Sequence, residues 1–162
     1  MTQFDKAIVS RPGEERVAPA PFGGQVVVHA TAEETGGALG MWETFTPPGK
    51  GPHDHTHTRE IEVFRVIRGA YRFRCGDDEF DAHPGAVVVM PPNIPHSFRN
   101  IGDEPCQMLV TVTPGGFEQG GSGRRVTASR DPVGRETECW PSAPNHRARP
   151  RLYRSCGFDG PL

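Results

Sequence analysis

The chain has 162 residues and a formal net charge of −2, a length that fits one domain able to bury a core without disulfides. No stretch approaches the ~20 apolar residues of a membrane-spanning helix, and no basic segment followed by an apolar one opens the sequence. We therefore expect a cytoplasmic protein without a membrane partner. The cysteines are widely spaced and form no C-x-x-C pair, which argues against a disulfide framework and a thiolate zinc site: Cys75, Cys106, Cys139 and Cys156.

Short strands separated by turns dominate the sequence as far as Pro114. Glycine and proline are frequent, at 20 and 17 residues, and the apolar runs are short and rich in Val, Ile and Phe. In chain order we predict strands at 24–30 and 38–49. Two more lie within 60–80, where Gly69 separates them and a hairpin turn follows at 76–78. The last strands are predicted at 86–92, 96–102 and 106–114. About eight strands at this spacing predict an all-β sandwich or small barrel of the jelly-roll kind.

The sequence changes character near residue 116. A glycine-rich stretch is followed by Arg- and Pro-rich sequence with few apolar residues and no periodicity. Residues 120–162 contain 8 of the 18 Lys and Arg residues but only 4 of the 20 Asp and Glu residues, so this segment is basic. This segment lacks a series of stacking aromatics and a helix-turn-helix pattern, so we favour a solvated or dimer-contacting tail over one that binds nucleic acid. We divide the chain into a folded domain, 1–116, and an irregular C-terminal extension, 117–162.

Three histidines, His53, His55 and His57, occupy alternate positions in "GPHDHTHTREIEVF". Alternate residues of an extended strand point to one face with Cα atoms roughly 6.5 Å apart, so two of these imidazoles can bind one ion, while the third would have to bend back. A carboxylate from the next strand and a distant histidine would complete a nitrogen and oxygen set that suits Fe, Mn, Ni, Co, Cu or Zn rather than Ca or Mg. The alternative is a surface loop that binds ions adventitiously.

Two longer patterns resemble the motifs of the cupin superfamily. The first, G-x5-H-x-H-x4-E-x6-G, and the second, G-x5-P-x-G-x2-H-x3-N, are matched at nine positions: Gly49, His55, His57, Glu62, Gly69, Gly85, Pro91, His96 and Asn100. Asn93 stands where the family has glycine, but Asn tolerates positive φ, so we expect the turn to be kept. The resemblance covers about residues 20–114 and implies a jelly-roll double-stranded β-helix, the cupin barrel, which usually forms a homodimer.

The resemblance also implies one divalent transition-metal ion per chain, with His55, His57, Glu62 and His96 as its ligands. The alternative register that uses His53 and Glu60 would break both outer glycine spacings. We therefore place His53 at the rim of the site, with a four-histidine site as the remaining alternative.

The resemblance does not fix the reaction, because cupins include enzymes of many kinds and binding domains. Our first hypothesis is a quercetinase-like dioxygenase of bacterial secondary metabolism, in which Glu62 accepts the proton of an aromatic or enolic hydroxyl. An aromatic small molecule would then bind in an apolar pocket lined by Met41, Phe64, Val66, Met90 and Phe98. A zinc-dependent aromatic polyketide cyclase is the second hypothesis, and a non-catalytic domain that binds a small ligand is the third.

Overall fold

The computed structural model describes residues 4–116, which form nine strands. In chain order these are β1 (Arg16–Ala20), β2 (Gly24–Ala30), β3 (Gly40–Thr46), β4 (Ile61–Arg68), β5 (Tyr71–Cys75), β6 (Asp78–Ala82), β7 (Val87–Met90), β8 (His96–Asn100) and β9 (Cys106–Thr113). No helix that could cross a membrane occurs in this part of the chain. The predicted C-terminal extension, with Cys139 and Cys156, lies outside the described residues, while Cys75 and Cys106 are free thiols.

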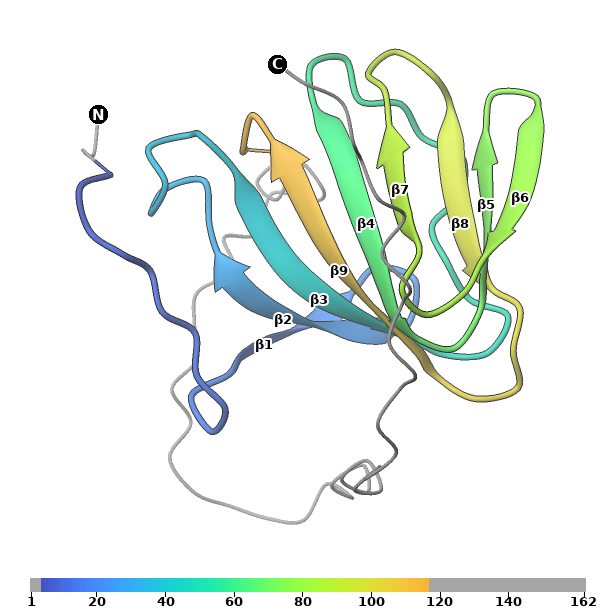
Figure 1. Ribbon diagram of the computed structural model, residues 1–162, viewed down its shortest axis with the longest axis horizontal. Helices are drawn as coiled ribbons and strands as arrows, with labels where there is room; N and C mark the ends of the chain where they lie inside the picture. Colours follow the sequence, from blue (N-terminus) through green and yellow to red (C-terminus); the bar gives the residue numbers. More distant parts are fainter. Residues whose placement is uncertain (1–3, 117–162) are drawn as a thin grey trace, which may run out of the picture. The chain divides into compact units, whose positions relative to one another are not determined.

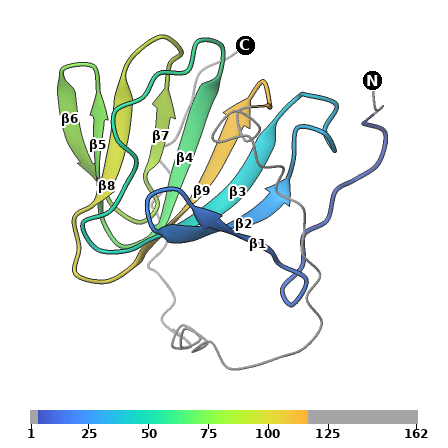
Figure 2. The same cartoon turned by 180° about the vertical axis from the view of Figure 1, so that it is seen from behind.

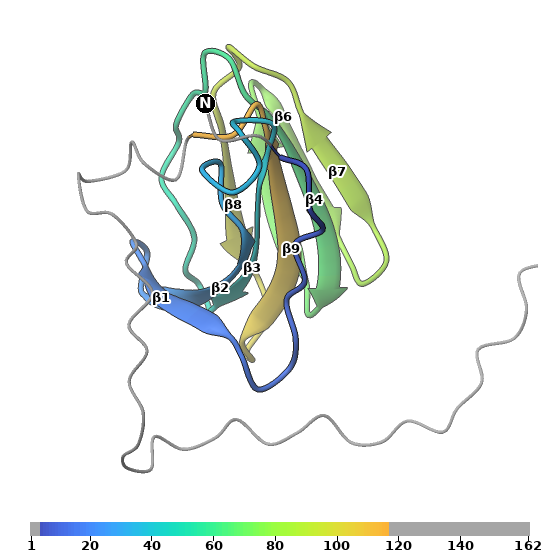
Figure 3. The same ribbon diagram turned by 90° about the vertical axis from the view of Figure 1, so that its left-hand side faces the viewer.

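The strands form two antiparallel sheets. The large sheet has six strands in the order β1-β2-β3-β9-β4-β7, and the small sheet has three in the order β6-β5-β8. Figure 1 shows the small sheet beside β4 and β7, and Figure 3 shows β1 and β7 at opposite edges of the large sheet. The predicted all-β jelly-roll fold is confirmed.

One apolar core lies between the two sheets. Side chains of β4 alternate between exposed and buried, and Phe64 and Val66 face the core. The ring of Phe64 lies 5.3 Å from the ring of Phe73 on β5 and 5.8 Å from that of Phe98 on β8. Burying a side chain of this kind stabilises the fold by about 1.5–3 kcal/mol. The aromatic contacts therefore hold the two sheets at a fixed separation.

The structure adds one strand that the sequence did not predict. The missed strand, β1, has the sequence RVAPA and pairs with β2 at the edge of the large sheet. Proline lacks a backbone donor, so Pro19 is tolerated at an edge but weakens the strand signal in the sequence. The predicted hairpin is present: Cys75 pairs with Asp78 across a two-residue turn, and Gly76 adopts a φ of 60° that favours glycine.

The connection between β3 and β4, residues 47–60, runs beside β8 and continues the small sheet past its edge (Figure 2). Near its start, Gly49 donates a backbone hydrogen bond of 3.0 Å to the carbonyl of Asn100. A Cβ added at Gly51 would lie 1.8 Å from the carbonyl oxygen of Phe98, so the connection can approach β8 this closely only with glycine at that position. The connection carries all three of the alternating histidines.

Candidate metal centre

Four side chains from three parts of the fold meet at one point between the sheets. His55 and His57 come from the 47–60 connection, Glu62 from β4 and His96 from the first position of β8. Each offers one ligand atom, and these atoms all lie within 4.8 Å of one another. Glu62 points inward because it shares a face of β4 with the buried Phe64. The large sheet thus supplies the carboxylate and the small-sheet side supplies the imidazoles.

Backbone hydrogen bonds fix the three histidines relative to one another. His55 donates to the carbonyl of His96 at 3.0 Å, and His96 donates to the carbonyl of His55 at 2.9 Å. The amide of Asn93, in the turn before β8, donates to the carbonyl of His57 at 2.7 Å. The ring centroids of His55 and His96 are 4.6 Å apart, and that of His57 lies 5.0 Å from His55.

Further contacts orient two of the imidazole rings. Nδ1 of His55 lies 2.8 Å from the carbonyl oxygen of His53, and Nδ1 of His96 lies 2.9 Å from that of Ile94. A carbonyl oxygen only accepts hydrogen bonds, so each Nδ1 carries the proton. In the neutral ring, Nε2 is then the nitrogen with a lone pair for a metal ion.

Glu62 approaches two of the three histidines of the cluster. Its Oε2 is 3.0 Å from Nε2 of His96 and 3.6 Å from Nε2 of His57, and the three residues are 2–5% exposed. Burial lowers the pKa of His57. Burial also opposes charge on His96, but the hydrogen bonds to Glu62 and to the Ile94 carbonyl outweigh it and raise the pKa of His96. A buried carboxylate needs positive charge beside it, so either a shared proton or a cation stabilises this arrangement.

The donor set fits a single divalent transition-metal ion. Three imidazole nitrogens and one carboxylate oxygen are a mixed set that suits ions from Mn²⁺ to Zn²⁺ rather than Ca²⁺ or Mg²⁺. An ion that takes five or six ligands keeps one or two positions for water or substrate beside four protein ligands. The cluster therefore has the composition of an open site.

His53 does not join the cluster. Its side chain is exposed, and the ligand atoms grouped within residues 4–116 belong to His55, His57, Glu62 and His96. The contribution of His53 to the site is its backbone carbonyl, which holds the ring of His55. The structure thus places the side chain of His53 outside the ligand group.

The predicted pocket residues divide into two groups. Phe64, Val66, Met90 and Phe98 all face the core, where each is at most 9% exposed. Their contact with a substrate stays a prediction. Met41 is a correction, because it pairs with Thr111 on the outer face of the large sheet, the face opposite to the buried Thr44. The sequence predicted Met41 as an inward residue, but alternation along β3 turns its side chain away from the core.

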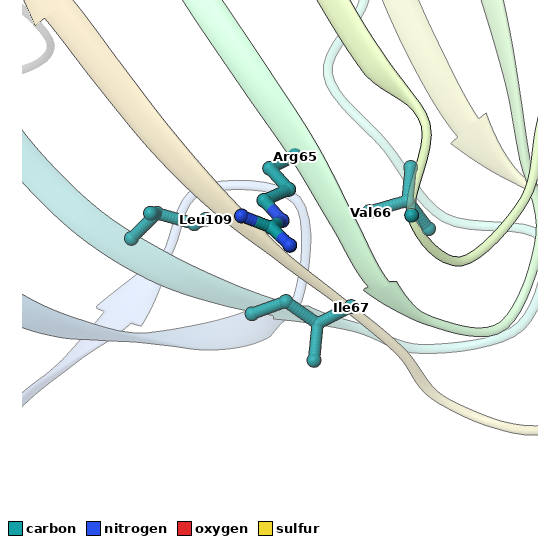
Figure 4. Close-up of a pocket in the computed structure, with 5 residues that line it drawn as sticks. Arg65, Val66, Ile67 and Leu109 are labelled. Atoms are coloured by element: carbon teal, nitrogen blue, oxygen red, sulfur yellow. The ribbon is translucent and has the colours of Figure 1, made fainter. Parts of the chain in front are cut away.

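A shallow pocket of about 420 Å³ lies beside β4 and is lined by Arg65, Val66, Ile67, Gly85 and Leu109. Figure 4 shows Arg65 and Ile67 on one side of β4 and Val66 on the other. None of the four clustered residues lines this pocket, so it is separate from the candidate metal centre.

One polar group beside the cluster was not predicted. Asp54, between His53 and His55, accepts a hydrogen bond of 2.6 Å from the hydroxyl of Ser97. That hydrogen bond and the charge of Arg74 hold the pKa of Asp54 below its usual value. The signal in the sequence was its place between two histidines, where alternation turns a side chain to the face opposite the ligands.

Comparison with known proteins supports the assignment of the fold. The profile of the cupin domain family matches residues 41–112. Among curated proteins, an uncharacterized protein of Methanocaldococcus jannaschii is 26% identical over 72 residues, 44% of this chain and 58% of its own length. Polyketide synthase CurC of Streptomyces cyaneus is also 26% identical, over 84 residues that make up 52% of this chain and 53% of CurC. The chain thus spans little more than half the length of these two relatives.

The solved structure of KdgF from Halomonas sp. superimposes with a TM-score of 0.59 at 16% identity, over 67% of this chain and 94% of KdgF. At this identity the likeness concerns the fold alone. The fold agrees with the family match, and both motifs lie where the jelly roll brings their histidines and glutamate together. Residues 41–112 of this chain are thus similar to the cupin domain family, and the fold of the described residues agrees with that likeness.

Proposed function

We propose that the protein is a mononuclear metal-dependent enzyme that promotes ring closure of a polyketide-type substrate, with the ion bound by His55, His57, Glu62 and His96. The observation that carries this proposal is the cluster itself, in which three imidazoles and one carboxylate place their ligand atoms within 4.8 Å of one another. The substrate class is supported by the relative named polyketide synthase CurC, which is 26% identical over 84 residues.

A bound divalent ion would supply a Lewis acid that polarises a ketone or enol oxygen and so acidifies the neighbouring C–H group. The protein itself would move the proton. His57 and His96 both approach Oε2 of Glu62, so Oε1 is the carboxylate oxygen that can accept the proton from carbon. The resulting carbanion would form a C–C bond to a ketone carbon farther along the substrate, and Glu62 would return the proton to the oxygen of that ketone.

The residues around the carboxylate favour this chemistry because they are apolar and buried. Met90 pairs with Glu62 across β4 and β7 and is 1% exposed, and Phe64 follows on the same face of β4. Removing water from such a site strengthens the electrostatic interactions inside it. It also protects a reactive carbanion from protonation by solvent, so ring closure can compete with simple proton exchange.

A quercetinase-like dioxygenase is a second candidate. It is supported by the donor set, which leaves room for further ligands, and by the aromatic rings of Phe64 and Phe98, which suit a flat phenolic substrate. Here Glu62 would accept the proton of an aromatic hydroxyl, and dioxygen would be the second substrate. The two candidates share the metal centre and the base, but only the dioxygenase consumes oxygen.

The first experiment is elemental analysis by mass spectrometry of protein that is expressed without a tag and without added metal. We expect about one transition-metal ion per chain, and removal of that ion with a chelator should abolish turnover. A preparation that binds no transition metal, even after reconstitution, would contradict the proposal.

The second experiment separates the two reactions. A synthetic poly-β-ketone thioester is incubated with the metal-loaded protein under nitrogen, and quercetin is incubated with it in air while oxygen consumption is recorded. Metal-dependent formation of a cyclic product under nitrogen supports the cyclase, and oxygen uptake with quercetin shifts the assignment to the dioxygenase. Tight binding of either compound without turnover would instead indicate a non-catalytic binding domain.

A further inference from the structure

Two rows of side chains cross the same three chain segments on opposite faces of the small sheet. The inner row consists of His55, His96 and Cys75, since His55 bridges His96 and His96 pairs with Cys75. The outer row lies one residue along and consists of Asp54, Ser97 and Arg74, with Ser97 and Arg74 again a cross-strand pair. Successive residues of extended chain point to opposite faces, so a register shift that moves one row must also move the other.

The outer row is closed by hydrogen bonds that converge on Asp54. Its Oδ1 accepts the 2.6 Å hydrogen bond from the hydroxyl of Ser97, and its Oδ2 forms an ion pair with the Nη1 of Arg74. Arg74 also donates from Nε to the carbonyl of Gly76 at 3.0 Å, which holds the guanidinium over the β5–β6 turn. One carboxylate therefore joins the 47–60 connection to both β8 and β5.

His55 is the ligand that gains most from this support. Glu62, His57 and His96 are buried, whereas His55 is only half-buried. At His55 the contact with β8 is an isolated bridge, and further backbone hydrogen bonds between the connection and β8 lie at the other end of β8, where Gly49 and Lys50 contact Asn100. The core therefore restrains His55 less than the other three ligands.

We propose that Asp54 is a positioning residue for the metal centre: by fixing the register between the 47–60 connection and β8, it sets the placement of the His55 imidazole relative to His96. This inference rests on the proposed metal-binding function. A ligand that is already held in its binding position need not be ordered when the ion arrives, and the ion binds more tightly for that reason.

The test compares metal affinity in matched variants. Asp54→Ala should raise the dissociation constant for Zn²⁺, measured by competition with a chromophoric chelator, by about tenfold, the lower end of the range for residues that support metal ligands. Asp81→Ala is the control, because Asp81 forms a comparable exposed pair with Arg72 on the same sheet, at 2.7 and 3.1 Å, away from the ligands. Its Zn²⁺ affinity should stay within about twofold of the wild type.

Asp54→Asn gives an intermediate test, since the amide oxygen can still accept from Ser97 but carries no charge for Arg74. Its affinity should lie between those of the wild type and Asp54→Ala. The visible absorption of the Co²⁺-loaded protein, which depends on ligand geometry, should change in Asp54→Ala and not in Asp81→Ala. If Asp54→Ala binds Zn²⁺ as tightly as Asp81→Ala does, the positioning role is wrong.

A measurement on metal-free protein separates this inference from the proposed function. The amides of His55 and His96 donate to each other's carbonyls, so their hydrogen exchange reports on the register directly. Asp54→Ala should accelerate exchange at both amides, and Asp81→Ala should not. If the wild type binds no Zn²⁺, the proposed function fails. Hydrogen exchange in the metal-free proteins still tests the positioning role of Asp54. Unchanged exchange rates at His55 and His96 in Asp54→Ala would overturn that role.

Discussion

The amide of Asn93 donates a hydrogen bond of 2.7 Å to the carbonyl of His57, so the turn that precedes β8 is attached to a residue of the ligand cluster. Asn93 adopts a φ of 64°, the only positive φ of a non-glycine residue in the described part of the chain. The substitution of Asn for the glycine of the second motif therefore keeps the turn, as the sequence predicted.

This geometry predicts different effects for two substitutions of Asn93. Asn93→Ala should lower the free energy of unfolding by about 1–2 kcal/mol, because a Cβ is disfavoured in the left-handed region. Asn93→Gly should stay within about 1 kcal/mol of the wild type, since glycine accepts this φ. Urea unfolding curves of the metal-free proteins measure both values. Equal stability of the Ala and Gly variants would show that φ at this position does not limit the fold.

Substitution of the alternating histidines tests which of them bind the ion. His57→Ala should remove most of the bound metal, because it deletes one of four ligands and opens a position to water. His53→Ala should retain it, since the exposed side chain of His53 lies outside the cluster and its backbone carbonyl is unchanged by the substitution. The metal content of the dialysed proteins gives the answer, and equal loss in both variants would restore the four-histidine alternative.

Replacing Glu62 by glutamine tests whether the carboxylate acts as a base. Glu62→Gln keeps the size and a neutral oxygen ligand but removes the negative charge and the proton acceptor. Metal content should fall modestly, while turnover per bound ion should fall by about 10²–10⁴-fold, the usual contribution of a general base. Activity must be divided by metal content, since lost ions would imitate lost catalysis. Full activity per ion would exclude the base role and leave the ion alone to polarise the substrate.

Substitution of two glycines of the motifs distinguishes the stability cost of a positive φ from the cost of close packing. Gly69 has a φ of 80°, and a Cβ there would lie 2.2 Å from the Sγ of Cys106, whereas Gly85 has a φ of 94° with no atom within 4 Å of such a Cβ. Gly85→Ala should cost about 1 kcal/mol of stability through φ alone. Gly69→Ala should cost about 1–3 kcal/mol more, because the buried thiol must move. Thermal unfolding checks the difference, and equal losses would mean that Cys106 moves aside freely.

The candidate site was more accessible to sequence analysis than the contacts that support it. The motif spacings named His55, His57, Glu62 and His96, and the structure brings these four together because both motifs are local patterns of turn and strand. Asp54 was missed because its partners, Ser97 and Arg74, become neighbours only through the register between the 47–60 connection, β8 and β5. Such a register is a property of the folded chain, and the place of Asp54 between two histidines indicates only the face on which its side chain lies.

In the fold, too, local sequence patterns predicted most strands but not the features that depend on pairing between strands. Strands with alternating apolar residues, such as β4 and β9, were predicted because one face of each is buried. The edge strand β1 was missed because its five residues include Pro19, which weakens the strand pattern in the sequence. The predicted orientation of Met41 was wrong because a strand pattern does not show which face of the strand points to the core. Cross-strand pairing fixes that face, here through the pairing of Met41 with Thr111.

The division of the ligands between the two sheets has a thermodynamic consequence. Glu62 belongs to the large sheet, whereas His55, His57 and His96 lie on the side of the small sheet, so an ion held by all four joins the two layers across the core. An ion that binds only the folded chain adds about 2.7 kcal/mol to the free energy of unfolding when its free concentration is one hundred times the dissociation constant. The resistance of this protein to unfolding would then rise and fall with the supply of metal, and starvation for that metal would shorten its lifetime before it limited its chemistry.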